Sequence, residues 1–162
     1  MQKALEQAAN ALQNGEFPVG CVIVHEDRIV AVGSRENSAG LPNEMDHAEI
    51  IALRSLLNSG FAKDPAELVV YSTMEPCLMC FSTLIVNGIR TIVYAYEDAM
   101  GGGTDVSLRD LKPFYKDLAI SIIPHVMRKE SLELFARFFQ RKDNLYLHDS
   151  FLAHYTLEQY RS

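Results

Sequence analysis

Short segments rich in valine and isoleucine alternate with amphipathic segments along this chain of 162 residues. The expected strands span residues 18–24, 28–37, 67–73, 90–96 and 118–124. The expected helices span residues 3–14, 46–59, 77–87, 108–115 and 130–142. Because crossovers between parallel strands place their helices on the faces of a sheet, this order predicts helices on both faces. We therefore expect an α/β fold, a three-layer α/β/α sandwich around one five-stranded mixed sheet.

The composition is typical of a globular protein with one hydrophobic core. Of the residues, 48% are hydrophobic and 22% are charged, and the chain has the length of one ordinary domain. It has no run of about 18 apolar residues, so we expect no membrane span. The amphipathic N-terminal segment lacks the apolar block of a secretory signal, which favours a cytoplasmic location.

Two further features limit the possible partners and covalent chemistry. The formal net charge of −6 provides no overall attraction to the phosphates of a nucleic acid. The three cysteines, Cys21, Cys77 and Cys80, are an odd number and form a poor disulfide framework. We expect Cys21, which lies inside an apolar strand, to be a small core residue.

The segment "EPCLMC" places Cys77 and Cys80 three residues apart at the start of an expected helix. Pro76 suits the first position of that helix. The partial positive charge of a helix N-terminus favours thiolates over thiols. This pattern is compatible with a thiol redox pair, which needs only the two cysteines, and with a metal site, which needs further ligands.

The segment "DHAE" supplies candidates for those further ligands, because His47 and Glu49 also lie at the start of an expected helix. One imidazole and two thiolates make three protein ligands and leave a fourth zinc position open, as in catalytic zinc sites. We therefore predict that His47, Cys77 and Cys80 bind zinc. Glu49 then remains free to move protons as a general acid and base.

H-x-E followed by P-C-x-x-C is the signature of zinc-dependent nucleobase deaminases. The segments "GEFPVGCVIV", "HAEIIALR" and "STMEPCLMC" occur in the order seen in the cytidine deaminase-like superfamily, which residues 2–142 resemble. The most similar branch contains tRNA adenosine deaminases, guanine deaminases and fungal cytosine deaminases. This resemblance implies hydrolytic removal of a ring amino group with release of ammonia, one Zn²⁺ per chain and a homodimer. Residues 1–142 would form the deaminase domain, and residues 143–162 a C-terminal helical tail of the same domain.

The resemblance also implies positions for substrate contacts. Asn37 would hydrogen-bond the edge of a base, and Asp98 would lie near the sugar or the exit path. Main-chain groups at Ala48, Glu75 and Cys77 would line the pocket, with Pro18 and Val19 behind the ring. Related free-base deaminases fold a C-terminal aromatic segment over the pocket, which suggests a lid formed by one of Phe151, Tyr155 and Tyr160.

The identity of the substrate depends on loops in which this chain differs from the tRNA enzymes. It has "NEMD" before His47, where those enzymes commonly have Asp-Pro-Thr-Ala, and "AMGGGTDVSLRDL" in place of their loop after the fourth strand. Arg137, Arg141 and Lys142 could contact phosphates, but the negative net charge favours a small nucleobase or nucleoside over tRNA. A tRNA-specific adenosine deaminase, a non-catalytic zinc-binding domain and a thiol redox protein remain as alternatives.

Overall fold

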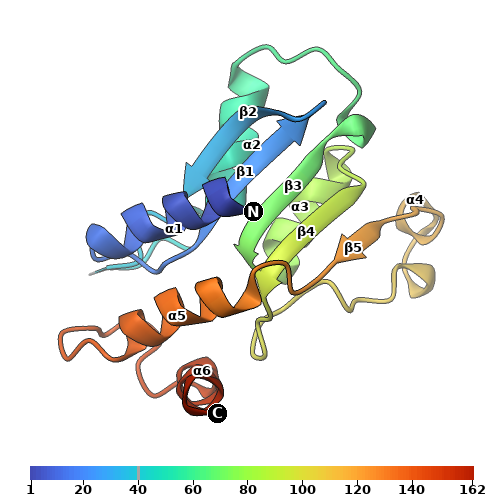
Figure 1. Ribbon diagram of the computed structural model, residues 1–162. Helices are drawn as coiled ribbons and strands as arrows, with labels where there is room; N and C mark the ends of the chain where they lie inside the picture. Colours follow the sequence, from blue (N-terminus) through green and yellow to red (C-terminus); the bar gives the residue numbers. More distant parts are fainter. Residues whose placement is uncertain (40) are drawn as a thin grey trace.

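The computed structural model describes residues 1–39 and 41–162, and its centre is one five-stranded sheet (Figure 1). The strands are β1 (Gly20–His25), β2 (Arg28–Ser34), β3 (Val69–Met74), β4 (Thr91–Tyr96) and β5 (Ser121–Ile123). Their order in the sheet is β2-β1-β3-β4-β5. β1 pairs antiparallel with β2 and β3, whereas β4 pairs parallel with β3 and β5. The predicted mixed sheet is therefore confirmed.

Helices cover both faces of this sheet, which gives the predicted three layers (Figure 1). α1 (Gln2–Gln13) and α5 (Arg128–Phe139) lie on one face, and α2 (Ala48–Asn58) and α3 (Leu78–Val86) lie on the other. α6 (Phe151–Arg161) packs against α5. The shorter elements are the 3₁₀ helices Pro65–Glu67 and Leu108–Asp110 and the one-turn helix α4 (Pro113–Lys116). Within the described residues, no helix has the length and apolarity needed to cross a membrane.

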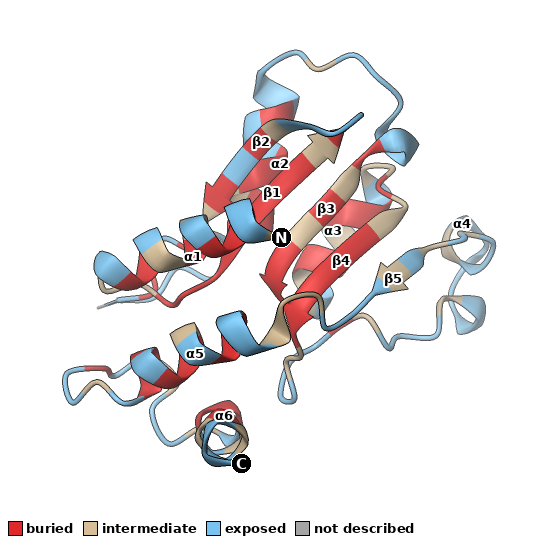
Figure 2. Cartoon of the chain, viewed as in Figure 1, coloured by how far each residue is buried: buried red, intermediate tan, exposed pale blue. Residues whose placement is uncertain are grey.

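The core lies between the sheet and its two helical layers (Figure 2). β1 is buried along nearly its whole length, as expected for a strand with helices on both faces. The aromatic side of α5 packs on Phe17, whose ring centroid lies 5.1 Å from that of Phe135 and 5.3 Å from that of Phe138. Leu152 and Ala153 of α6 join the same core, so the C-terminal segment is packed onto the rest of the chain.

Several element boundaries differ from the sequence-based expectation. The helix expected over 108–115 is divided into a 3₁₀ turn and α4, because the residue before Pro113 is sterically disfavoured in the helical conformation. The strand expected over 118–124 is limited to β5, which pairs with only three residues of β4. Pro76 precedes the N-cap Cys77 and is not the first helical residue.

Gly33 allows α2 to pack closely against β2. A Cβ atom at this position would overlap the carbonyl oxygen of Ala48 and lie 2.7 Å from the amide nitrogen of Ala52. We expect Gly33→Ala to destabilise the fold by about 1–3 kcal/mol, as overpacking typically does, measured by urea unfolding. Val32→Ala changes a half-exposed neighbour on the same strand and should stay within about 0.5 kcal/mol of the parent. Equal stabilities of Gly33→Ala and the parent would contradict the close packing.

Glu97, directly after β4, connects the starts of α5 and α6. Its carboxylate accepts hydrogen bonds from the Arg128 guanidinium, with Nε at 2.8 Å, and from the Tyr155 hydroxyl at 2.8 Å. Burial opposes ionisation of Glu97, but the hydrogen bonds from Arg128 and Tyr155 outweigh it and lower its pKa. The ionised carboxylate therefore stabilises the packing of the C-terminal segment.

We expect Glu97→Gln to lower the free energy of unfolding by about 1–3 kcal/mol at pH 7, because charged hydrogen bonds are lost. A carboxyl group with a lowered native pKa stabilises the fold fully above its unfolded-state pKa, and this contribution disappears as the pH falls through the native pKa. The parent and Glu97→Gln are compared by their free energies of unfolding in urea. The difference between these free energies should be constant from pH 7 to about pH 5 and shrink below the ordinary glutamate pKa. A difference that already shrinks between pH 7 and pH 5 would contradict this assignment.

Candidate active site

Two helices on the same face of the sheet begin at residues that carry metal-binding side chains. His47 is the N-cap of α2, with φ −66° and ψ 147°, and Cys77 is the N-cap of α3, with φ −63° and ψ 168°. Neither side chain caps its own helix. Glu49 and Cys80 follow within the first turns of α2 and α3. The two helix N-termini thus bring together two pairs of residues, of which His47 and Cys77 are 30 positions apart in the sequence.

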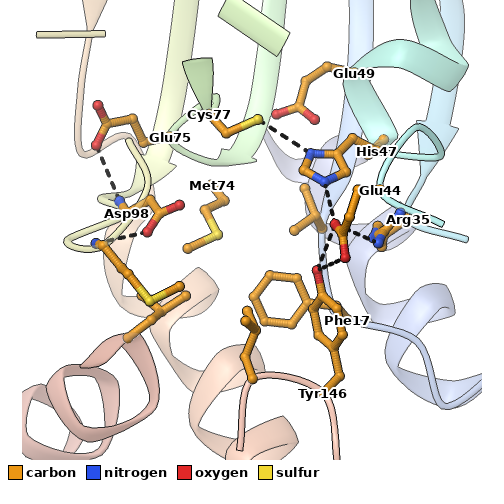
Figure 3. Close-up of a pocket in the computed structure, with 15 residues that line it drawn as sticks. Phe17, Arg35, Glu44, His47, Glu49, Met74, Glu75, Cys77, Asp98 and Tyr146 are labelled. Atoms are coloured by element: carbon orange, nitrogen blue, oxygen red, sulfur yellow. Dashed lines mark hydrogen bonds and ion pairs between the residues drawn. The ribbon is translucent and has the colours of Figure 1, made fainter. Parts of the chain in front are cut away.

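His47, Cys77 and Cys80 form one group of donor atoms, of which Figure 3 shows His47 and Cys77. His47 Nδ1 lies 3.6 Å from Cys77 Sγ and 3.5 Å from Cys80 Sγ, and all three donor atoms lie within 4.8 Å of one another. One imidazole nitrogen and two sulfurs are ligands that zinc prefers, and three of them leave an open position. Among the described residues this is the group placed to hold a metal, and Cys21 lies apart from it in the core.

The surroundings of the two thiols differ. Hydrogen bonding from Cys80 and then from His47 lowers the pKa of Cys77 to about 4. The same interaction with Cys77, together with burial, raises the pKa of Cys80. A cation bound by the two sulfurs would favour the thiolate form of both. The donor set thus suits a divalent cation.

Glu49 lies beside these donors and is 3% exposed. Its Oε1 accepts a hydrogen bond from Ser72 Oγ of β3 at 2.8 Å, and its Oε2 accepts one from Cys80 Sγ at 3.5 Å. Burial raises the pKa of Glu49, although the charge of His47 opposes this effect. A buried, oriented carboxyl group with a raised pKa is a suitable proton carrier. Ser72, whose hydroxyl fixes this carboxylate, lies in no motif that the sequence singles out.

A cavity of about 240 Å³ opens onto His47, Glu49 and Cys77 (Figure 3). Its wall is mostly apolar, and its apolar contributors are Phe17, Val19, Ala48, Met74, Met100, Tyr146, Leu147 and Leu152. Five of the residues predicted at or behind the substrate belong to the wall: Val19, Ala48, Glu75, Cys77 and Asp98. Of the described residues, Pro18 and Asn37 are not part of it.

Asn37 is not part of the wall of this cavity, and its contact with the edge of a base stays a prediction. Its side chain is exposed, its backbone has a φ of 53°, and its amide nitrogen donates to Asp46 Oδ2 at 2.7 Å. Asn43 donates to the same oxygen, also at 2.7 Å. The left-handed backbone at Asn37 and these two amides hold the loop before α2 together, so the side chain of Asn37 supports the loop outside the cavity.

The glycine-rich segment 101–103 packs onto Glu75 and Cys77. Glu75 accepts hydrogen bonds from the amide of Asp98 at 3.2 Å and from Thr104 Oγ1 at 2.5 Å. A Cβ atom at Gly102 would lie 2.5 Å from the Glu75 carboxylate, so a larger residue there would displace this carboxylate. Glu75 thereby shapes the loop that presents Asp98, whose pKa is raised by burial.

Three residues of the cavity wall, Arg35, Glu44 and Tyr146, were not identified from the sequence. The guanidinium of the buried Arg35 donates to Glu44 Oε2 at 3.2 Å, and the Tyr146 hydroxyl donates to the same oxygen at 3.0 Å. Tyr146 precedes α6, so the C-terminal segment does reach the cavity. The aromatics expected as a lid lie elsewhere: Phe151 and Tyr160 are exposed, and Tyr155 contacts Glu97.

The basic residues considered for phosphate binding lie near the end of α5, at a different surface. Arg137 and Arg141 line a groove beside α1 that shares no residue with the cavity. Arg141 also pairs with Asp143 at 2.9 Å. The groove that adjoins the cavity is instead acidic: it contains Glu75, Asp98 and other carboxylates around Arg128 and His125.

Comparisons with known proteins agree with this fold and site. Residues 1–96 match the family model described as the cytidine and deoxycytidylate deaminase zinc-binding region. The chain therefore belongs to the zinc-binding cytidine and deoxycytidylate deaminase family, and the predicted class of hydrolytic deaminase is confirmed.

Among the relatives, the tRNA-specific adenosine deaminase of Rickettsia felis is 32% identical over 147 residues, which cover 87% of this chain and 99% of that protein. The tRNA-specific adenosine deaminase 2 of Xenopus tropicalis is 38% identical over 109 residues, 64% of each chain, so the match spans less than two thirds of that relative.

A solved structure from a study of A-to-I editing by tRNA:A34 deaminases has a TM-score of 0.70 at 28% identity and covers 83% of this chain and 96% of that one. A guanine deaminase from Nitrosomonas europaea has a TM-score of 0.66 at 17% identity over 85% of this chain and 81% of that one, a likeness of fold alone.

Proposed function

We propose that this protein hydrolyses the ring amino group of a small nucleobase or nucleoside to a carbonyl group and releases ammonia. The observation that carries the proposal is the position of a buried carboxylate, Glu49, beside one imidazole and two thiols at the wall of a cavity. A redox pair of cysteines requires neither the histidine nor the carboxylate. A structural zinc site requires four protein ligands, whereas this group offers three.

In this proposal His47 Nδ1, Cys77 Sγ and Cys80 Sγ hold one Zn²⁺. When bound, zinc would lower the pKa of a water molecule to near neutrality. The Glu49 carboxylate removes a proton from the attacking water and passes it to a ring nitrogen; it then moves the proton of the hydroxyl group added to the ring carbon to the departing amine, which leaves as ammonia as the carbonyl group forms. Ser72 holds Oε1 of Glu49, and once Cys80 is a zinc-bound thiolate it would no longer donate to Oε2, which leaves Oε2 free to carry the proton. The backbone of Ala48 and the Glu75–Asp98 region border the space for the heterocycle.

The size and charge of the cavity support a small substrate. A volume of about 240 Å³ is below the roughly 300–1,000 Å³ of pockets for drug-sized ligands, and it suits a single heterocycle. The apolar wall suits the faces of a flat ring. The adjoining acidic groove would repel phosphate groups, which disfavours nucleotides and RNA.

The second candidate is deamination of adenosine in a tRNA anticodon. It is favoured by the relative from Rickettsia felis, which is named as a tRNA-specific adenosine deaminase and aligns over nearly its whole length. The basic end of α5 would then have to contact phosphates from a surface separate from the cavity.

Both candidates are tested by one experiment. The purified protein is analysed for bound metal, loaded with zinc and assayed for ammonia release on guanine, cytosine, adenosine, cytidine and an anticodon stem-loop. We expect about one zinc per chain and turnover of a free base or nucleoside. Turnover of the stem-loop alone would select the second candidate, and absence of both zinc and turnover would refute deamination by this chain.

We also propose that the protein is a homodimer. Helices α2 and α3 expose large apolar side chains on their outer sides, including Leu57, Leu78 and Val86, which are each at least half exposed. A second copy could cover these residues. Sedimentation equilibrium at micromolar concentration should give twice the chain mass, and a monomer mass would refute this proposal.

A further inference from the structure

We infer that Glu44 is a positioning residue for the metal ligand His47, and that Arg35 and the C-terminal residue Tyr146 hold Glu44 in place. This inference rests on the proposed function, in which His47 binds zinc. The sequence motifs assign no role to Glu44. It lies in the loop before α2, a segment in which this chain differs from the tRNA enzymes. Figure 3 shows its carboxylate between the imidazole of His47, the guanidinium of Arg35 and the hydroxyl of Tyr146.

The two nitrogens of the His47 ring face different partners. Nδ1 faces the sulfurs of Cys77 and Cys80 at 3.6 Å and 3.5 Å, whereas Nε2 lies 3.2 Å from Glu44 Oε2. An imidazole that binds a metal through Nδ1 carries its proton on Nε2, and this N–H donates to Glu44. A carboxylate acceptor at that position fixes both the tautomer and the orientation of the ring and makes the ligand more basic.

Glu44 needs its other partners, because 59% of its side chain is exposed and a free carboxylate on a loop would be mobile. Arg35 Nη2 donates to Glu44 Oε2 at 3.2 Å, and Arg35 Nη1 donates to the carbonyl of Asn43 at 2.7 Å. Arg35 is only 2% exposed, so its guanidinium is a fixed point. Both the side chain and the backbone of the loop are thus attached to one buried cation.

Tyr146 adds a contact from a distant part of the chain. Its hydroxyl donates to Glu44 Oε2 at 3.0 Å and lies 3.2 Å from Oε1, although the two residues are separated by 102 positions. The ring of Tyr146 packs on Phe17 with centroids 5.4 Å apart and lies under the guanidinium of Arg35 at 5.7 Å. The segment that closes one side of the cavity is therefore linked to the metal ligand through a single carboxylate.

The test measures zinc binding and uses no substrate. Zinc-loaded protein is mixed with an excess of a chromogenic chelator, and the rate of zinc transfer and the equilibrium affinity are measured for the parent, Glu44→Ala, Glu44→Gln and Tyr146→Phe. Glu36→Ala is the matched control, since Glu36 is an exposed carboxylate in the same loop. Loss of a carboxylate partner of a ligating histidine typically weakens metal binding by about 10–100-fold. We expect that loss for Glu44→Ala, smaller losses for Glu44→Gln and Tyr146→Phe, and none for Glu36→Ala.

Two further measurements separate positioning from general stability. The thermal midpoint of the metal-free protein should fall only slightly in Glu44→Gln, which loses the charge that faces Arg35 but keeps nearly the same side-chain volume. The visible spectrum of the cobalt-loaded protein should shift in Glu44→Ala, because that spectrum depends on the orientation of the histidine ligand.

Glu44→Ala with the zinc transfer rate and cobalt spectrum of the parent would overturn the inference, as would an equal effect of Glu36→Ala. A parent protein that binds zinc but deaminates nothing would refute the proposed function and leave the result on Glu44 standing. A parent protein that binds no zinc would overturn both.

Discussion

Replacing Glu49 by glutamine is expected to lower kcat for deamination by about 10²–10⁴-fold while leaving one zinc bound per chain. The amide of glutamine has nearly the same shape as the carboxyl group but cannot accept and release a proton. Because the carboxylate of Glu49 is buried and is held by Ser72 at 2.8 Å, no solvent-exposed group can readily replace it. Ammonia release and metal content are measured on the same preparation.

The control for this variant is Glu133→Gln, which changes an exposed carboxylate on α5 and should retain full activity and full zinc content. The combination of lost turnover and retained zinc distinguishes a catalytic site from a zinc domain that only binds a partner. Unchanged turnover in Glu49→Gln would contradict the assignment of Glu49 as the proton carrier.

Replacing Cys80 by alanine is expected to abolish zinc binding and, with it, all turnover. Two ligands would remain, and the affinity should fall by more than the roughly 10–100-fold that loss of a ligand's hydrogen-bond partner alone causes. Cys80 is fully buried, and its sulfur lies 3.5 Å from both His47 Nδ1 and Glu49 Oε2. Zinc content after dialysis against metal-free buffer, with the thermal midpoint of the same sample, measures the effect.

Cys21→Ala is the matched control, because it removes another fully buried thiol of this chain that lies outside the donor group. It should keep its zinc even if the small cavity it creates lowers the stability. The thiol redox alternative predicts the opposite pattern: a disulfide between Cys77 and Cys80 in the active protein, and full function in His47→Ala. Zinc retained in Cys80→Ala would contradict the proposed ligand set.

The donor group could be predicted from the sequence because each of its members lies in a short motif at the start of a helix. A helix that packs on a sheet lies roughly along the strands, because its apolar side must cover the sheet. Two helices on the same face that begin after loops at the same end of the sheet therefore have neighbouring N-termini. The positions of His47, Cys77 and Cys80 therefore follow from local patterns and from the order of strands and helices. The positions of the residues packed around them cannot be predicted from such patterns.

Arg35, Glu44 and Tyr146 illustrate the limit. Their contacts join the end of β2, a loop and a segment near the C-terminus, and no periodicity or spacing relates these positions. Asn37 shows the same limit: its type and position match a family pattern, but in this structure a left-handed backbone at φ 53° and a hydrogen bond to Asp46 direct its amide to the loop, and its contact with a base stays a prediction. Such outcomes depend on loop conformation, which short motifs do not determine.

The location of the two helix starts has a consequence for how the specificity of this protein can change. The atoms proposed to perform the chemistry belong to α2, α3 and their N-cap residues, and both helices are fixed to the sheet by buried side chains. Most of the polar residues around the heterocycle belong to the loop before α2, the loop after β4 and the segment before α6. Insertions or substitutions in those three segments can reshape the cavity without displacing the chemical centre. Exchange of these loops with those of relatives is therefore a direct route to a different amino-substituted ring.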